Sequence, residues 1–186
     1  MNSLENWFCA SGFWRSLTEQ KWLPWALEGV GLGEHVLEVG AGPGAATSAL
    51  AARAPRVTSL EYSHRFCVGL RAKYPAAGVV QGDAAILPFE GGTFTAAIAV
   101  LVLHHLRSTE AQDRAFTEIH RVLIPGGIFV ALEIVDGWLS RVLHIRSTFV
   151  PVAPDQVGSR LQAAGFANVE IKNRSGGFLL RAKRSL

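Results

Sequence analysis

The most constraining feature of the sequence is a short apolar segment that ends in glycines and leads directly into a helical pattern. Glu34–Val39 is typical of a strand, and Gly40–Gly44 is a glycine-rich turn before the helix expected over residues 45–53. Such a turn exposes backbone N–H groups at a helix N-terminus, where a ligand can approach closely and meets a partial positive charge. In an open α/β sheet, ligands bind in the crevice beyond the strand ends. The sequence therefore predicts a ligand site at this turn.

The rest of the chain alternates between strand and helix patterns. Further strands are expected at 56–60, 79–81, 94–102 and 128–135, and further helices at 64–73, 109–123 and 155–164. Two last strands, 169–172 and 178–182, flank Ser175-Gly176-Gly177 and indicate a hairpin. This order predicts an α/β fold: a seven-stranded, mostly parallel sheet with helices on both faces. The hairpin adds one antiparallel strand at or near an edge.

Two helix boundaries have specific signals. Thr109 and Gln112 have the spacing of a capping box, which predicts the start of one helix, and Pro125-Gly126-Gly127 predicts its end. Residues 1–30 are rich in aromatic side chains and predict two short amphipathic helices, the second beginning at Pro24. We expect one domain over residues 1–186, with residues 1–30 as a helical cap and residues 34–183 as the core. The aromatic residues favour core packing; a ligand cage and a membrane-surface helix are the alternatives.

Composition limits the other classes of function. The 186 residues are 49% hydrophobic and 18% charged, as in a globular chain. The net charge of +3 is scattered, apart from Arg181, Lys183 and Arg184, so we expect no nucleic-acid partner. Cys9 and Cys67 lie far apart, without metal-ligand spacing or a secretory signal, which predicts a cytoplasmic protein and no metal site. No apolar run approaches the roughly 18 residues of a membrane span.

The glycine turn alone leaves two ligands open. Residues 40–45 also satisfy the dinucleotide pattern G-x-G-x-x-A, and Glu61 stands at the distance expected of a ribose-binding acid. The carboxylate of Glu38, just before the turn, would repel a pyrophosphate but suits the ammonium of a methionine moiety. Asp83 follows the third strand, where it could accept a proton from an adenine amino group. These acids favour S-adenosylmethionine (SAM) over NAD(P).

Five segments in register resemble the class I SAM-dependent methyltransferases, most closely the broad type 11 group. They are residues 36–47, 60–62, 82–89, 101–106 and 121–127. The resemblance covers residues 34–183 and implies a Rossmann-like fold, SAM as cofactor and S-adenosylhomocysteine (SAH) as product. It departs from many relatives at Phe94-Thr95, where they have Phe-Asp, a change that we interpret as structural. The acceptor would be a small molecule with an oxygen, nitrogen or sulfur nucleophile.

The resemblance also implies roles for individual residues. Those that would bind the cofactor are Glu38, Gly40, Ala41, Gly42, Gly44, Glu61, Tyr62, Asp83, Ala84 and Leu101. Glu38, the turn and the Leu101 backbone would surround the methionine, and Glu61 would accept both ribose hydroxyls. Tyr62 would pack beside the adenine, with Asp83 and the Ala84 amide at its edge.

The catalytic residues are harder to predict than the cofactor-binding ones. The sulfonium of SAM already makes the methyl group electrophilic, so such an enzyme needs no obvious catalytic side chain. His104 and His105 follow a buried strand at the ligand end of the sheet, and histidine accepts protons near neutral pH. His104 is favoured as a base, and the alternative is that one ring bonds a loop while the other is solvated. No role is assigned to four further polar residues in or after the fifth strand, namely Glu133, Asp136, His144 and Arg146. The short segment 136–153 leaves a non-catalytic SAM-binding module open, and the chain is expected to be a monomer or homodimer.

Overall fold

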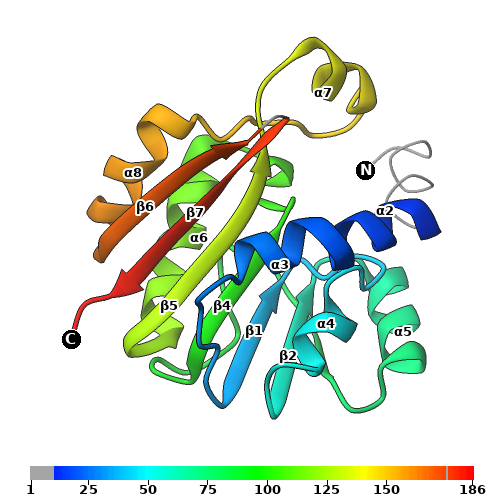
Figure 1. Ribbon diagram of the computed structural model, residues 1–186, viewed down its shortest axis with the longest axis vertical. Coiled ribbons are helices and arrows are strands. Elements are labelled where there is room, and N and C mark those ends of the chain that lie inside the picture. Colours follow the sequence, from blue (N-terminus) through cyan, green and yellow to red (C-terminus); the bar gives the residue numbers. More distant parts are fainter. Residues whose placement is uncertain (1–10, 175) are drawn as a thin grey trace.

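The computed structural model describes residues 11–174 and 176–186, which form a seven-stranded sheet covered by helices (Figure 1). The sheet order is β3-β2-β1-β4-β5-β7-β6. The strands are β1 (His35–Val39), β2 (Arg56–Glu61), β3 (Gly78–Gln81), β4 (Phe94–Val100), β5 (Leu123–Ile134), β6 (Phe166–Arg174) and β7 (Gly177–Arg184). The helices are α2 (Gly12–Leu17), α3 (Leu23–Ala26), α4 (Thr47–Ala51), α5 (His64–Lys73), α6 (Thr109–Val122), α7 (Trp138–Leu143) and α8 (Pro154–Ala163). A π-helix, Thr18–Trp22, joins α2 to α3, and a 3₁₀ turn, Leu103–His105, follows β4.

The topology confirms the predicted sheet. Strands β1 to β5 pair in parallel, whereas β7 lies antiparallel between β5 and β6. The strand order reverses on either side of β1, which pairs with β2 on one side and with β4 on the other. A reversal of this kind opens a crevice beyond the carboxyl ends of the two central strands. The glycine turn follows β1 and therefore lies at that crevice.

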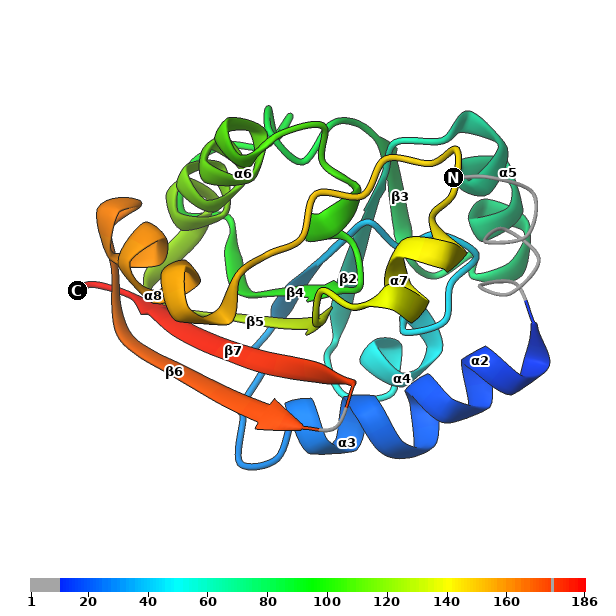
Figure 2. The same cartoon turned by 90° about the horizontal axis from the view of Figure 1, so that it is seen from above.

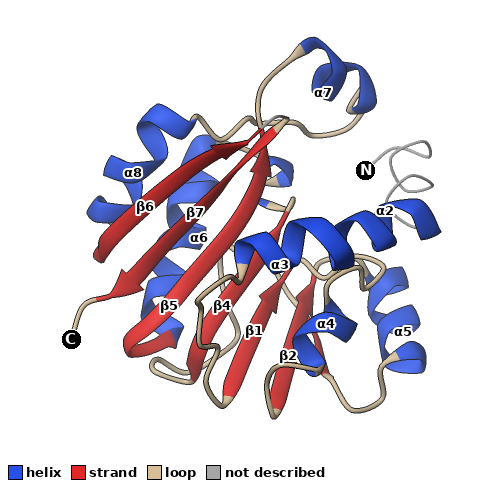
Figure 3. Ribbon diagram, viewed as in Figure 1, coloured by secondary structure: helices blue, strands red, loops and turns tan. Residues whose placement is uncertain are grey.

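Helices cover both faces of the sheet (Figure 3). Alternate residues of a strand point to opposite faces, so Val36 and Leu37 of β1 belong to different hydrophobic clusters. The cluster on one face includes Phe116 of α6 and Leu161 of α8. The cluster on the other includes Leu23 of α3 and Leu50 of α4. Both clusters are fully buried along the central strands, which explains the near-continuous apolar sequence of β4.

The N-terminal segment differs from the predicted pair of helices. Pro24 lies in the first turn of α3 as predicted, but the chain is helical without a break from Gly12 to Ala26, so α3 is not a separate helix. The Leu23 amide donates to the carbonyl of Thr18, five residues back. This wider π turn lets the helix continue past a proline that has no N–H of its own. Trp7 and Phe8 of the aromatic-rich segment lie outside the described residues.

Helix α6 begins at Thr109 as predicted, but its cap and the start of the strand after it differ from the prediction. Ser108, with an extended backbone, caps α6 by accepting from the Ala111 amide at 3.2 Å, so the capping box predicted one residue later is wrong. Strand β5 begins directly after α6, and Pro125-Gly126-Gly127 lies within it, near the point where its register with β4 shifts. Segment 136–153 contains the short helix α7, which the sequence did not predict. Within the described residues, every helix is too short or too polar to cross a bilayer.

Candidate functional site

A cavity of about 630 Å³ lies beyond the carboxyl ends of the parallel strands. Its walls come from the segments that follow β1, β2, β3 and β4, and Thr148 completes them. Figure 2 shows this end of the sheet from above, with the loop after α7 passing over it. The volume is ordinary for a cofactor or small-molecule site. All the predicted cofactor residues except Gly44 line this cavity.

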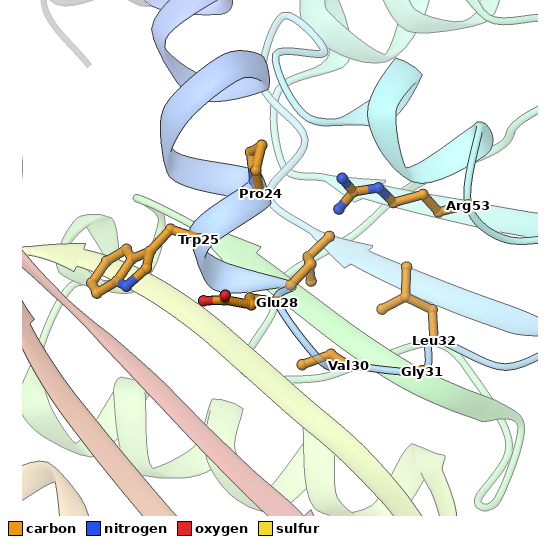
Figure 4. Close-up of a pocket in the computed structure, with 8 residues that line it drawn as sticks. Pro24, Trp25, Glu28, Val30, Gly31, Leu32 and Arg53 are labelled. Carbon is orange, nitrogen blue, oxygen red and sulfur yellow. The ribbon is translucent and has the colours of Figure 1, made fainter.

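A second hollow of about 640 Å³ lies under α3 (Figure 4). Its lining includes Pro24, Trp25, Glu28 and Arg53, together with residues 30–32. Because residues 30–32 precede β1, this hollow lies toward the amino ends of the strands. It has no strand-to-helix glycine turn and no pair of converging carboxylates. The two cavities have nearly equal volumes, so volume does not identify the ligand site. The position of the first cavity and the residues that line it favour it as the ligand site.

The glycine turn is tied to the neighbouring strand. The amides of Gly40 and Ala41 both donate to the Leu60 carbonyl at the end of β2, at 2.8 and 3.1 Å. Gly40 has a φ of +70° and Gly44 a φ of +85°, a region that glycine enters readily and other residues rarely do. Gly44 packs against the ring of Tyr74, whose hydroxyl donates to the Gly44 carbonyl at 3.0 Å. Gly44 therefore shapes the turn from behind the cavity.

Glu61 ends β2 with its carboxylate beneath the turn. One of its oxygens accepts from the Gly42 amide at 2.8 Å, and the other accepts from the Ser63 amide at 2.7 Å. The residue is only 8% exposed and lines the cavity. Each carboxylate oxygen can accept more than one hydrogen bond. Glu61 therefore fixes the turn and can still accept from two vicinal hydroxyls.

Glu38 is a buried acid at the floor of the cavity. The hydroxyls of Thr47 and Ser59 donate to one of its oxygens, at 2.8 and 2.6 Å. Burial raises the pKa of Glu38 to about 7, a rise that the two hydroxyls oppose and the nearby charge of Glu61 reinforces. A carboxylate in this environment is well placed to pair with a cationic ligand group. Thr47 and Ser59 were not predicted from the sequence, because they come from α4 and β2 and have no fixed spacing from Glu38.

The raised pKa of Glu38 predicts a pH-dependent stability. Since the folded protein binds this proton more tightly than the unfolded chain does, the stability of the ligand-free protein should fall as pH rises from about 4.5 to about 7. Glu38→Gln removes the ionisation but keeps an acceptor for the hydroxyls. We therefore expect the variant to melt several degrees above wild type at pH 8. Thermal melts at pH 5 and pH 8 check this, and an equal difference at both pH values would contradict it.

Tyr62 follows β2 and Asp83 follows β3, so both lie on the side of the cavity away from the central strands β1 and β4. The Asp83 carboxylate accepts from the Ala85 amide at 2.9 Å, which holds the loop after β3. Tyr62 is 61% exposed, and its hydroxyl accepts from Arg107 at 2.9 Å. Together with Ile86, 73% exposed, Tyr62 gives this part of the cavity an open apolar rim. A flat ring such as adenine fits a wall of this composition.

The segment after β4 forms the remaining wall. Leu101 has a φ of +55°, unusual for a residue with a branched side chain, and its amide donates to the Leu132 carbonyl. Backbone strain of this kind is common at ligand sites, where the surrounding structure holds it in place. Val102 follows and contacts the glycine turn, since a side chain at Gly40 would meet it. The geometry therefore couples the turn after β1 to the turn after β4.

The two predicted catalytic histidines occupy different positions. His105 lines the cavity, and burial lowers its pKa to about 3, so its imidazole is neutral near pH 7. His104 is 2% exposed and lies behind the cavity wall, with its Nδ1 2.5 Å from a carboxylate oxygen of Glu133. The other Glu133 oxygen accepts from the amides of Val102 and Leu103. Glu133 thus joins the end of β5 to the turn that carries both histidines.

Comparisons with known proteins identify the family. A model of a methyltransferase domain (Methyltransf_11) matches residues 37–131, from β1 through most of β5. An uncharacterized methyltransferase of Synechocystis sp. is 31% identical over 156 residues, which cover 79% of this chain and 73% of that protein. The chain belongs to the SAM-dependent methyltransferases. Its cofactor is SAM, so the NAD(P) alternative left open by the glycine pattern is set aside.

Other similar proteins agree with this methyltransferase assignment. A demethylmenaquinone methyltransferase of Clavibacter sepedonicus is 29% identical over 197 residues, covering 89% of this chain and 76% of that protein. Among solved structures, the PH0226 protein from Pyrococcus horikoshii superposes with a TM-score of 0.80 at 18% identity over 95% of this chain and 94% of that one. A methyltransferase of Haloferax volcanii, solved in complex with its activator Trm112, has a TM-score of 0.77 at 17% identity, covering 100% and 99%. These structures share the class I methyltransferase fold.

Proposed function

We propose that this methyltransferase transfers the methyl group of SAM to a small-molecule acceptor through an oxygen, nitrogen or sulfur nucleophile. The observation that carries the proposal is the division of one cavity into two kinds of wall. Glu38, Glu61 and Asp83 line the part where a cofactor would lie, whereas Leu106, Arg114 and Thr148 line other parts of the cavity. The apolar and basic character of those other parts suits a small hydrophobic or anionic acceptor. The demethylmenaquinone methyltransferase similarity is in keeping with a small-molecule acceptor.

The arrangement assigns separate tasks to the acids of the site. Glu38 would pair with the ammonium of the methionine part, Glu61 would accept the two ribose hydroxyls, and Asp83 would accept from the adenine amino group. The backbone of Leu101 would lie beside the methionine. The methyl group would then face the wall formed by the segment after β4. Alignment of two bound reactants can lower a barrier by roughly 7–11 kcal/mol, more than a single general base typically does.

In the reaction, a lone pair of the acceptor forms the new bond to the methyl carbon while the bond from that carbon to the sulfonium sulfur breaks. The sulfur keeps the electron pair, which gives SAH, and the acceptor releases one proton. We infer that a histidine of the turn after β4 assists the loss of that proton. His104 is favoured over His105, whose pKa of about 3 makes it a weak proton acceptor. If His104→Ala and His105→Ala both retain the wild-type rate, this role fails.

Titration calorimetry tests the cofactor assignment. We expect wild type to bind one SAH, and we expect Glu38→Gln to weaken SAH more than methylthioadenosine, which has the adenosine part but no amino acid. SAH affinity of wild type should also fall as pH drops below about 7, because Glu38 then takes up a proton. Methylthioadenosine affinity should change little over the same range. Equal pH dependence for both ligands would contradict the role of Glu38.

A panel of acceptors with radiolabelled SAM then tests the reaction. Phenols, thiols, amines and quinols of low molecular mass represent the candidate nucleophiles. Transfer of label to one class would identify the acceptor chemistry. Saturable SAM binding without transfer to any class would favour a binding module and contradict the proposal.

A further inference from the structure

Three histidines from two separate segments converge beside the cavity. His104 and His105 belong to the 3₁₀ turn after β4, and His144 follows α7, about forty residues later in the chain. One ring nitrogen of each lies within 4.8 Å of those of the other two. The ring centroids of His104 and His105 are 4.2 Å apart, and those of His104 and His144 are 5.0 Å apart. His104 and His144 are buried.

The Nδ1 atom of each ring faces a hydrogen-bond acceptor. His104 Nδ1 is 2.5 Å from a carboxylate oxygen of Glu133, and His144 Nδ1 is 2.6 Å from the Ser140 carbonyl. His105 Nδ1 is 3.3 Å from the Thr148 carbonyl. A carbonyl oxygen can only accept, so these contacts place the proton on Nδ1 and the ring lone pair on Nε2. Histidines that bind metals show this arrangement, with the second nitrogen bonded to a carboxylate or a backbone carbonyl.

We propose that His104, His105 and His144 form a binding site for a divalent transition-metal ion, best suited to zinc, beside the methyl-acceptor part of the cavity. Three neutral imidazoles are a ligand set of catalytic zinc sites, which leave a fourth position open. The buried carboxylate of Glu133 would offset part of the charge of the ion. No metal site was expected from the spacing of the two cysteines, and His144 lies too far from the other two histidines in the chain to form a sequence motif with them.

The dimensions allow such a site with small side-chain movements. Zinc binds imidazole nitrogens at about 2.0–2.1 Å, so three nitrogens around a tetrahedral ion lie roughly 3.4 Å apart. The present separations, up to 4.8 Å, would shorten as the ion binds. His144 follows the short helix α7 and stacks on the ring of Phe149, with centroids 4.5 Å apart, so binding would require the two rings to move together. Of the three histidines, His105 lines the cavity, so the ion would lie at the cavity wall.

The role of the ion rests on the proposed methyl transfer, whereas the metal site rests on the histidine geometry alone. A hydroxyl or thiol of the acceptor would coordinate at the open position and lose its proton to solvent, because a metal ion lowers the pKa of its ligands. Its lone pair would then attack the methyl group of SAM, and the sulfonium sulfur would leave as the thioether of SAH. No further reactant is needed, and the ion keeps its oxidation state.

The site is tested by metal titration of the untagged full-length chain after treatment with a chelator. We expect one Zn²⁺ per chain in calorimetry, and Co²⁺ in the same site should give the visible absorption of a tetrahedral complex. His144→Ala should weaken Zn²⁺ binding more than about 100-fold, and Glu133→Gln by about 10- to 100-fold. His64→Ala is the matched control, since this exposed histidine bonds Gln81 at a place outside the cluster. It should bind Zn²⁺ as wild type does.

Two results would overturn the site: no stoichiometric Zn²⁺ binding by folded wild type, or equal binding by His144→Ala and His64→Ala. The Co²⁺ spectrum of wild type needs no variant and remains decisive if a variant fails to fold. SAH titration of the same samples keeps the two proposals apart, because loss of metal binding with intact SAH binding rejects only the metal site. If Zn²⁺ binds but does not change the rate with an identified acceptor, its role in activating the acceptor is rejected.

Discussion

Glu61→Ala is expected to weaken SAH binding at least tenfold, or about 1.4 kcal/mol or more. The substitution removes the acceptors proposed for both ribose hydroxyls. It also leaves the amides of Gly42 and Ser63 without the oxygens that hold them at 2.8 and 2.7 Å. Both losses act on the same part of the ligand. Methylthioadenosine, which keeps the ribose, should therefore be weakened by a similar factor, in contrast to the expectation for Glu38→Gln.

The Glu61→Gln variant tests the hydrogen-bonding role of the carboxylate separately from the size of the side chain. A carboxylate accepts at both ends, whereas an amide accepts at one end and donates at the other. The variant would therefore direct an NH₂ group at the amide of Gly42 or Ser63, and we expect it to bind SAH more weakly than wild type despite its similar shape. Glu90→Gln, an exposed position outside the cavity, is the control and should bind as wild type. Unchanged SAH affinity in a folded Glu61→Ala protein would reject the ribose role.

Gly40→Ala is expected to lower the melting temperature by about 10 °C. A Cβ atom at this position would stand 2.1 Å from Cγ2 and 2.8 Å from Cβ of Val102, on the turn after β4. The positive φ of +70° adds a backbone cost of about 1–2 kcal/mol, and overpacking adds about 1–3 kcal/mol. Because the two turns form adjacent walls of the cavity, SAH affinity should fall as well. Thermal unfolding without ligand, followed by SAH titration, measures the two effects separately.

Gly42→Ala is the matched control for stability. Gly42 also has a positive φ, +53°, but an added Cβ would meet no atom within 4 Å. Only the backbone cost of about 1–2 kcal/mol applies, so the melting temperature should fall by about 2–8 °C, less than in Gly40→Ala. Equal losses in the two variants would show that the contact with Val102 contributes nothing. Gly40→Ala, Val102→Ala tests the same contact, because the smaller side chain should restore part of the stability.

The sequence was sufficient for the architecture because its signals are local. Apolar patterns predicted all seven described strands, and the buried side chains of β1 and β4 follow from the helices that cover both faces of the sheet. The order of elements then limited the topology to a mostly parallel sheet with a terminal hairpin. The details that it placed wrongly, a separate helix beginning at Pro24 and a capping box at Thr109, depend on hydrogen bonds of single residues. Neither a π turn nor the use of Ser108 as the cap changes the periodicity of apolar residues, so the sequence pattern does not predict them.

What the sequence by itself determined is the sheet, the glycine turn and the acids at or just after the carboxyl ends of β1, β2 and β3. Their spacing from strand ends is local, and parallel strands bring their carboxyl ends to one edge. Only the tertiary structure decided which atoms meet there. The hydroxyls of Thr47 and Ser59 donate to Glu38. Val102 packs against Gly40, and the ring of His144 contacts that of His104. These pairs join residues that are distant in the chain, and packing of the whole domain fixes their separation.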